Sequence, residues 1–351
     1  MTRFIQLHLL TAYPPSNLNR DDLGRPKTAI VGGTERLRIS SQSLKRAWRT
    51  SALFGEALGQ YQGTRTKRLG MEMYKRLQEQ GTDEKKAQKW AESIVEKFGK
   101  PKPDNKLETE QLVHVSPEEW AAVMTLADTL ATEQREPEPD ELKLLREHPQ
   151  AVDIALFGRM LASSPVHNVE AAVQVAHAIT VDSAKIEDDF FTAVDDLNRH
   201  DVDAGAGHMG DAGFGSGIYY LYLCIDRDLL VRNLNQGRDD GDSALADRAI
   251  AALIETAAKV APTGKQNSFA SRAYTSYLLA EKGTQQPRSL SVAFLKAIRN
   301  PDPMQAAITA LETQREHFDR VYGACADQYR VLNAHAGAGD TLETLLAFVR
   351  E

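Results

Sequence analysis

The 351-residue sequence contains only two cysteines, Cys224 and Cys325, which lie far apart along the chain. Two isolated thiols provide neither a disulfide framework nor the paired ligands of a structural zinc site. No apolar run approaches the roughly 20 residues of a membrane-spanning helix, and residues 1–13 lack the pattern of a signal peptide. We therefore expect a cytoplasmic protein with reduced thiols and no membrane partner.

Signatures of common enzymes are also missing. Residues 205–210 match the letters of the GxGxxG dinucleotide pattern, but they lead into an expected strand instead of opening a helix. Gly264-Lys265 lacks the first glycine and the following hydroxyl residue of a P-loop. The histidines form no metal-binding pair at helical spacing with a glutamate, and no serine occupies a nucleophile elbow. We predict no enzymatic activity, no cofactor and no metal site.

One catalytic alternative rests on an acidic segment that contains Asp188, Asp189, Asp195 and Asp196. Several carboxylates can bind Mg²⁺ and support phosphodiester cleavage. A solvated charged loop has the same composition. A metal-dependent RNA nuclease is therefore retained as the alternative function.

Basic residues are concentrated at the N-terminal end of a chain that is acidic overall, with a net charge of −7. Residues 1–51 contain nine basic and three acidic side chains, so this segment is +6 and the remainder is −13. Polyanion binding depends on neutralising phosphates with Lys and Arg. The asymmetry favours a polyanion bound at one face of the protein.

Alternation of apolar and polar residues predicts strands over 4–10 and 36–40. In the first strand Gln6 and His8 fall on the outward side, and in the second Arg36 does. Further strands are expected over 218–225 and 274–280, and an acidic, glycine-rich segment at 182–217 predicts an extended hairpin or loop. Helices are predicted over 117–130, 153–161, 169–179, 242–261, 290–299, 303–321 and 341–350.

The most informative helix is expected directly after Ser40 or Ser41, either of which can cap it. Gln42, Lys45 and Arg49 are spaced at i, i+3 and i+7, so they share one face, while apolar residues take the other. Amide groups at the helix start and its positive dipole end suit a phosphate oxygen. An ordinary capped surface helix would show the same pattern without a ligand.

Several ordered blocks together carry a family resemblance. They are Asn19-Arg20-Asp21-Asp22, Ala29-Ile-Val-Gly32-Gly33, Arg38-Ile-Ser-Ser-Gln-Ser-Leu-Lys-Arg-Ala47, Asp153-Ile-Ala-Leu-Phe-Gly-Arg-Met160, Ala176-His-Ala-Ile-Thr180, Phe191-Thr-Ala-Val-Asp-Asp-Leu197 and Gly264-Lys-Gln266. Through these blocks the chain resembles the CasC family, whose members form the backbone of type I-E CRISPR Cascade complexes.

The resemblance implies an α+β fold shaped like a right hand. An RRM-like (ferredoxin-like) palm would be formed by 1–55 and by 218–351, the latter with the C-terminal helices. A helical fingers insertion would cover 56–180, and a β-hairpin thumb 181–217.

The resemblance also implies a function. Several copies would polymerise along one CRISPR guide RNA (crRNA), each thumb displacing one nucleotide at a regular interval while the other bases pair with target DNA in antiviral defence. The implied partners are crRNA, target DNA through the guide, other copies of the chain, and the large, small, guide-end-capping and guide-processing Cascade subunits. A generic RNA chaperone with an RRM-like palm remains a further alternative.

Two groups of site residues follow from the resemblance. Those implied to bind RNA are Arg20, Lys27, Ser40, Gln42, Ser43, Lys45, Arg46, Arg49, Lys265 and Gln266. Those implied to form the thumb wedge and to contact the displaced nucleotide are Met160, Phe191, Thr192, Val194 and Met209. Thumb carboxylates would repel the guide, so we expect Asp195 and Asp196 to pair with basic groups of a neighbouring subunit.

Overall fold

The computed structural model describes residues 2–193, 208–238 and 242–350. The chain divides into two compact units, which are described separately. We call the first the sheet unit; it comprises Met1–Ala52, Val175–Cys224 and Leu253–Glu351. We call the second the helical unit; it comprises Leu53–Gln174 and Ile225–Ala252. The resemblance described above implies that residues 225–252 belong to the palm.

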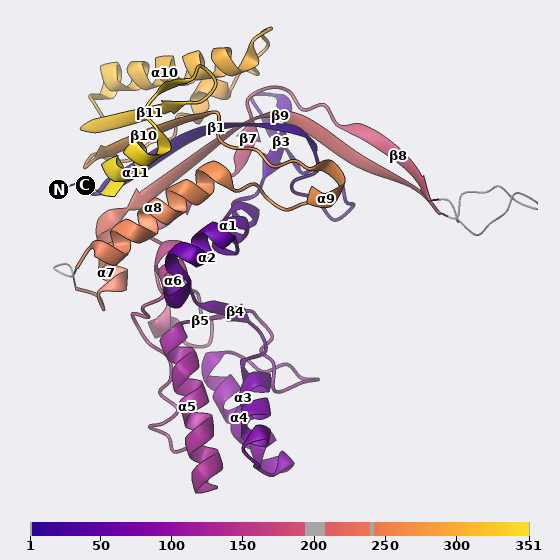
Figure 1. Ribbon diagram of the computed structural model, residues 1–351, viewed down its shortest axis with the longest axis vertical. Helices are drawn as coiled ribbons and strands as arrows, with labels where there is room; N and C mark the ends of the chain where they lie inside the picture. The colour runs from indigo at the N-terminus through magenta and orange to yellow at the C-terminus, as the bar shows by residue number, and fades with distance from the viewer. Residues whose placement is uncertain (1, 194–207, 239–241, 351) are drawn as a thin grey trace, which may run out of the picture. The chain divides into compact units, whose positions relative to one another are not determined.

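The sheet unit is built on one large sheet, in which the order of the strands differs from their order in the sequence. Within the described residues, eight strands follow the order β12-β11-β10-β1-β9-β7-β3-β2, and β8 pairs with β9 beside this path (Figure 1). The strands are β1 (Phe4–Ser16), β2 (Thr28–Val31), β3 (Thr34–Ile39), β7 (Ala178–Thr180), β8 (Glu187–Ala193), β9 (His208–Asp226), β10 (Tyr277–Gly283), β11 (Gln328–Asn333) and β12 (Ala338–Gly339). The chain therefore has a mixed α+β fold in which segments distant in sequence share one sheet.

Both faces of the central strands are buried, which corrects the prediction for the first strand. Strands β1 and β10 pair antiparallel, with Leu9 opposite Leu278. Helix α10 (Pro303–Tyr322) and helix α11 (Leu342–Arg350) lie on opposite sides of this pair (Figure 1). The expected outward residues Gln6 and His8 are 1% and 0% exposed. Alternation along one strand could not reveal that the polar side would also be covered.

Arg36 was likewise expected to face solvent, and this prediction is wrong. Its side chain is fully buried. The guanidinium donates hydrogen bonds to the carbonyl oxygens of Thr180 at 2.9 Å and Phe294 at 3.1 Å. A buried charge needs such partners. Arg36 therefore joins β3 to β7 and to the turn η3 (Ser291–Phe294).

Two predicted helices are not helices. Residues 169–179 contain the strand β6 (Val173–Val175) and the start of β7. Strand β6 pairs with β9, and Ile179 of β7 pairs with Arg38 on one side and with Tyr220 on the other. The helix expected over 290–299 is reduced to η3.

The remaining elements of the sheet unit follow the sequence more closely. The predicted strand over 218–225 lies within β9, and that over 274–280 overlaps β10. Helices α10 and α11 were both predicted. The segment 182–217 contains an antiparallel β8–β9 pair, which we call the β8–β9 hairpin. Two further helices, α1 (Ser41–Arg49) and α9 (Gln266–Phe269), border the candidate site.

The helical unit has its own apolar core, centred on helices that pack around Trp90, Ile94 and Phe98. Its elements are α2 (Ala52–Leu58), η1 (Gly59–Tyr61), β4 (Thr64–Thr66), α3 (Leu69–Glu79), α4 (Glu84–Phe98), β5 (Val113–Val115), α5 (Pro117–Glu133), α6 (Val152–Phe157), η2 (Pro165–His167), α7 (Arg227–Leu234) and the start of α8 (Ala244–Lys259). Helix α6 ends earlier than predicted, at Gly158, whose φ of 81° breaks the helix.

The capping box predicted for α5 is present. The Ser116 hydroxyl accepts from the Glu119 amide at 3.1 Å, and the Glu119 carboxylate accepts from the Ser116 amide at 2.9 Å. Glu119 also forms a buried ion pair with Arg159 at 2.8 Å. Throughout the described ranges, no helix combines the length and apolar character needed to cross a membrane.

Candidate nucleic-acid interface

Helix α1 has the two faces predicted from its spacing. Leu44 and Trp48 are buried, whereas Gln42 and Arg46 are exposed. Lys45 and Arg49 are half-buried along the same outer side. The Ser40 hydroxyl caps the helix by accepting from the Ser43 amide at 3.3 Å. In the fully described first turn of α1 there is no acidic residue, so its positive dipole end is not neutralised locally.

Asn19 connects the start of α1 to the loop that follows β1. Its side-chain oxygen accepts a hydrogen bond from the Ser40 backbone amide at 2.9 Å. Its own carbonyl accepts from the Lys27 amide at 2.8 Å, and Arg20 forms a β-bridge with Pro26. These bonds place Arg20 and Lys27 beside the helix start. Asn19 is not among the residues predicted for the site, and the run of turn-forming residues around it is its signal in the sequence.

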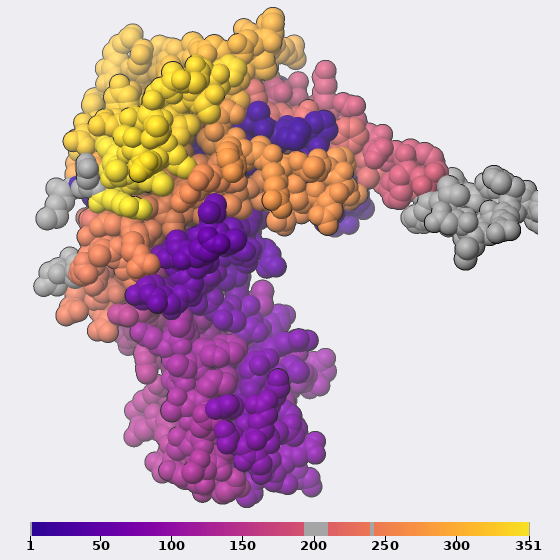
Figure 2. All heavy atoms as spheres, in the orientation of Figure 1, coloured from indigo at the N-terminus to yellow at the C-terminus, as the bar shows by residue number. Residues whose placement is uncertain are grey.

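A second loop approaches the same region from a distant part of the sequence. In Figure 2 the orange segment after α8 lies against the indigo N-terminal segment. The contact is close, because a Cβ built on Gly264 would lie 2.3 Å from the carbonyl oxygen of Leu18. Lys265 has a left-handed φ of 44°, and Gln266 then begins α9. Glycine at 264 thus permits the Lys265 loop to pack against the end of the β1 segment.

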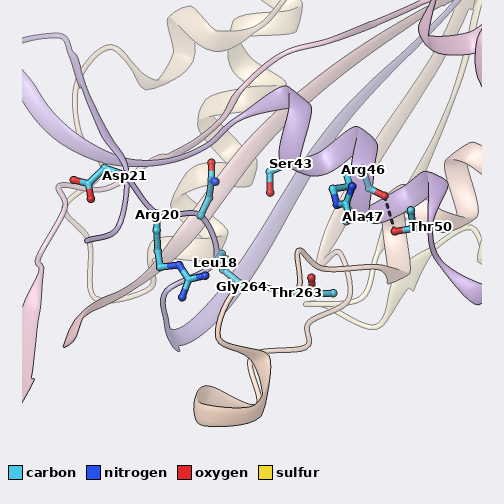
Figure 3. A pocket seen from close by; sticks show the side chains of 10 residues that line it. Leu18, Arg20, Asp21, Ser43, Arg46, Ala47, Thr50, Thr263 and Gly264 are labelled. Carbon is cyan, nitrogen blue, oxygen red and sulfur yellow. Dashed lines mark hydrogen bonds between the residues drawn. The ribbon is translucent and has the colours of Figure 1, made fainter. Parts of the chain in front are cut away.

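The three segments enclose an open pocket of about 400 Å³ (Figure 3). Helix α1 contributes Ser43 and Arg46, and the Arg20 side chain reaches toward the Gly264 loop. The lining is completed by Leu18, Asn19, Asp21, Ala47, Thr50 and Thr263. Among the implied RNA-binding residues, the pocket therefore joins Arg20, Ser43 and Arg46. Gln42, Lys45, Arg49, Lys27, Lys265 and Gln266 lie on the bordering elements but not in the lining.

A second basic group lies on β3 and at the start of β7. The Arg38 guanidinium Nη1 is 3.0 Å from Nδ1 of the exposed His177. Partial burial lowers the pKa of His177, and the charges of Arg38 and Lys27 lower it further. His177 is not among the site residues predicted from the sequence. Its link to Arg38 is a contact between strands that local spacing does not reveal.

The β8–β9 hairpin carries two neighbouring phenylalanines. Phe190 and Phe191 are 67% and 42% exposed, and Thr192 is also exposed. The Phe191 ring lies against Gly210, where an added Cβ would come within 2.6 Å of the ring. Met209 pairs with Thr192 along the strands. Val194 lies outside the described residues.

Met160, the remaining residue implied to contact a displaced nucleotide, belongs to the helical unit. Its side chain is 79% exposed. It borders an open pocket of about 310 Å³ together with Leu112, which is 50% exposed. An apolar surface at Met160 is therefore present within this unit.

The acidic residues of the hairpin are partly accounted for within the chain. Asp188 forms an exposed ion pair with Arg25 at 3.2 Å. Asp195 and Asp196 lie outside the described residues, so their expected pairing with a neighbouring subunit stays a prediction. No set of three or more histidine, cysteine, aspartate or glutamate side chains arranged for a metal ion occurs in the part of the chain that the structure describes.

Comparison with known proteins identifies the family. The family model described as CT1975-like protein matches residues 5–347, and the chain belongs to this family. No curated protein sequence matches the chain.

Solved structures share the fold along the whole chain. One chain from a structure titled "CRISPR RNA-guided surveillance complex, pre-nicking" is 31% identical, with a TM-score of 0.84 over 99% of this chain and 100% of its own length. A chain from a "CRISPR RNA-guided surveillance complex" is 25% identical, with a TM-score of 0.74 over 98% of this chain and 99% of its own. The protein is thus similar throughout to subunits of RNA-guided surveillance complexes.

Proposed function

We propose that this protein is a crRNA-binding backbone subunit of a CRISPR Cascade complex, of type I-E. The observation that carries the proposal is the 31% identity and TM-score of 0.84 to a surveillance-complex chain over 99% of the sequence. In this proposal the protein is cytoplasmic, and the sheet unit acts as an RRM-like palm.

The charge distribution around α1 supports RNA binding. Of the nine basic residues in 1–51, Arg36 is buried on carbonyl oxygens and Arg25 pairs with Asp188. Six of the others lie on or beside α1, and they are Arg20, Lys27, Arg38, Lys45, Arg46 and Arg49. Phosphate contacts of this kind position a nucleic acid without reading its sequence, which suits a protein that must accept any guide.

We assign the β8–β9 hairpin the role of the thumb. Phe191, with Thr192, Val194 and Met209, would displace one guide nucleotide, and Met160 would contact that nucleotide. Apolar and aromatic contacts offset the few kcal/mol lost when a base is unstacked. The exposure of Phe191 and Met160 supports this role, because a residue that only packs a core would be covered.

The protein is proposed to act without catalysis, and the metal-dependent nuclease is the alternative. A direct experiment separates the two. The chain is co-expressed with a CRISPR transcript and the other subunits, and the mass and RNA content of the purified particle are measured. A backbone subunit gives a particle with several copies per RNA of uniform length, whereas an RNA-free monomer contradicts the proposal.

The same particle is then incubated with Mg²⁺ and with guide-complementary or unrelated RNA. A backbone subunit leaves the RNA intact over many hours, whereas a nuclease turns over. A generic chaperone would bind RNA without a fixed number of copies per length. The number of copies per nucleotide therefore distinguishes the scaffold from the chaperone.

A further inference from the structure

His177 lies at the edge of the basic surface around α1. Strands β3 and β7 are antiparallel, with Arg38 opposite Ile179 and Ile39 opposite Ala178. Continuation of this register places His177 beside Ser40, the cap of α1. Residues diagonal to each other across such a pair share one face of the sheet, and this is why the Arg38 guanidinium reaches the imidazole.

The hydrogen bond between these two side chains fixes the protonation state of the imidazole. Arginine has only donors and stays charged at all ordinary pH values. Arg38 Nη1 is 3.0 Å from His177 Nδ1, so Nδ1 must be the acceptor. A doubly protonated imidazolium has no acceptor nitrogen and could not keep this bond. Partial burial lowers the pKa of His177, and the charged groups that face the ring, the cations Arg38 and Lys27, lower it further.

We propose that His177 is a proton-coupled contact for the RNA backbone, neutral in the RNA-free protein and protonated when a phosphate binds between it and Arg38. The inference rests on the proposed function and adds to it a residue and a pH response. A phosphate oxygen accepts from both Arg38 and a protonated Nδ1, so it replaces the imidazole as the acceptor for arginine. The phosphate also offsets the positive charges of Arg38 and Lys27 beside the ring.

The coupling has a definite sign. Phosphate binding raises the pKa of His177 relative to the RNA-free protein, so binding takes up a proton and becomes tighter as the pH falls through this range. A rise of one pKa unit corresponds to a change in affinity of up to about tenfold. Between about pH 8 and pH 6, the range in which histidine titrates, we expect several-fold tighter binding at the lower pH.

The test measures equilibrium binding of the full chain to an oligouridine with hydroxyl ends, at constant ionic strength across this pH range. Uracil and internal phosphodiesters do not titrate there, so the probe contributes no protons. His177→Asn keeps a side-chain oxygen that accepts from Arg38 but cannot be protonated. Its affinity should change little between pH 8 and pH 6, so the pH response of the original protein should be lost.

Two further variants complete the design. His177→Lys carries a permanent charge and should bind at pH 8 at least as tightly as the original protein does at pH 6. His335→Asn is the matched control, because His335 is a part-exposed histidine of the same unit that lies 3.7 Å from Asp302; it should keep the full pH response. Proton uptake on binding, measured by calorimetry in two buffers of different ionisation enthalpy, should fall in His177→Asn alone.

The outcomes are distinct. Equal pH responses in the original protein and His177→Asn, or equal proton uptake, overturn the inference while leaving RNA binding intact. Failure to bind the oligonucleotide at any pH counts against the proposed function itself.

Discussion

The side-chain oxygen of Asn19 accepts a hydrogen bond from the backbone amide of Ser40 at 2.9 Å, and this bond joins the loop after β1 to the first turn of α1. Arg20 and Ser43, on either side of it, both line the pocket beside the helix. The bond therefore sets the spacing between cations that come from two different elements.

Replacing Asn19 with alanine should weaken RNA binding more than it weakens the fold. Loss of one such hydrogen bond lowers the free energy of unfolding by about 0.5–1.5 kcal/mol. We expect a fall in RNA affinity of roughly three- to tenfold, because the Arg20 loop is no longer held against α1. The measurements are equilibrium RNA binding and denaturant unfolding.

The control is Asn300→Ala. The Asn300 side-chain oxygen accepts from the Asp302 amide at 2.9 Å, so the same kind of bond is lost ahead of α10. It should reduce stability by a similar amount without changing RNA affinity. Equal affinity losses in the two variants would show that the Asn19 effect is a general loss of stability.

Removing Lys45 and Arg49 together should weaken RNA binding and flatten its dependence on salt. Each cation that contacts a phosphate of single-stranded RNA contributes about 0.7 to the slope of log affinity against log salt. The double variant Lys45→Ala/Arg49→Ala should thus lose between about 1 and 1.5 in slope. An unchanged slope would remove both residues from the contact surface.

Lys75, an exposed cation of the helical unit, provides a control for this experiment. Lys75 on α3 is 71% exposed and lies 3.9 Å from Glu79. Lys75→Ala removes one positive charge from the protein and should leave the slope unchanged. Comparison of the two variants separates local phosphate contacts from a general effect of net charge.

The parts of the fold that the sequence predicted are those determined by short-range chemistry. The capping box of α5 depends on Ser116 and Glu119, three residues apart, and it is present. The two faces of α1 depend on residues within two turns, and Leu44 and Trp48 are buried as expected. In both cases the residues that determine the structure are close neighbours in the sequence.

The predictions that were wrong concern residues whose partners are distant in the sequence. Arg36 is buried because a carbonyl oxygen 258 residues further on, that of Phe294, accepts its hydrogen bond. Ile179 lies in a strand and not in a helix because it pairs with Arg38 on one side and with Tyr220 on the other. The candidate site shows the same division. The cations of α1 could be predicted, but their connection to Asn19, Gly264 and His177 depends on contacts that local patterns do not contain.

Replacing Phe191 with alanine should abolish nucleotide displacement but leave the fold intact. Phe191 is 42% exposed, so its truncation should lower stability far less than the roughly 3–5 kcal/mol typical of a buried phenylalanine. In assembled particles, chemical probing of the guide should lose the regular pattern of reactive nucleotides. Thermal unfolding of the free chain provides the stability measurement.

Phe190 is the natural control because it is the next residue on the same strand. It pairs opposite Asp211, whereas Phe191 pairs opposite Gly210. Successive side chains on a strand point to opposite faces. Phe190→Ala should therefore keep the periodic pattern. Loss of the pattern in both variants would indicate that displacement requires large side chains on both faces of the hairpin, and not the Phe191 side chain in particular.

Glu281 should make the stability of the protein depend on acidity. The carboxylate is completely buried, accepts from Arg315 at 2.7 Å and from Arg288, and lies 3.3 Å from His8. Burial by itself would raise the pKa of Glu281, but the hydrogen bonds with His8 and Arg288 and the charge of Arg288 outweigh it and hold that pKa below its usual range. A carboxyl group with a lowered folded-state pKa stabilises the fold above the unfolded-state value of about 4.3.

The contribution of Glu281 is therefore lost as the pH falls below about 4 toward the folded-state pKa. His8 adds a second window, because burial lowers its pKa and the unfolded chain binds a proton below about pH 6.5 while the folded chain does not. We expect the free energy of unfolding to decrease from about pH 6.5 downward, most steeply below about pH 4. Denaturant unfolding at a series of pH values measures this profile.

Glu281→Gln removes the buried carboxylate of this ionic cluster and leaves Arg288 and Arg315 beside the more distant carboxylate of Asp319, at 3.6 and 4.0 Å. Removing one partner of a buried pair costs about 3–5 kcal/mol at neutral pH, and the decrease below about pH 4 should become shallower because the titrating group is gone. Glu316→Gln, at an exposed position of the helix that carries Arg315, should change neither quantity. A variant at 281 that kept the full acid sensitivity would show that other carboxylates, and not this one, hold the sheet unit together at low pH.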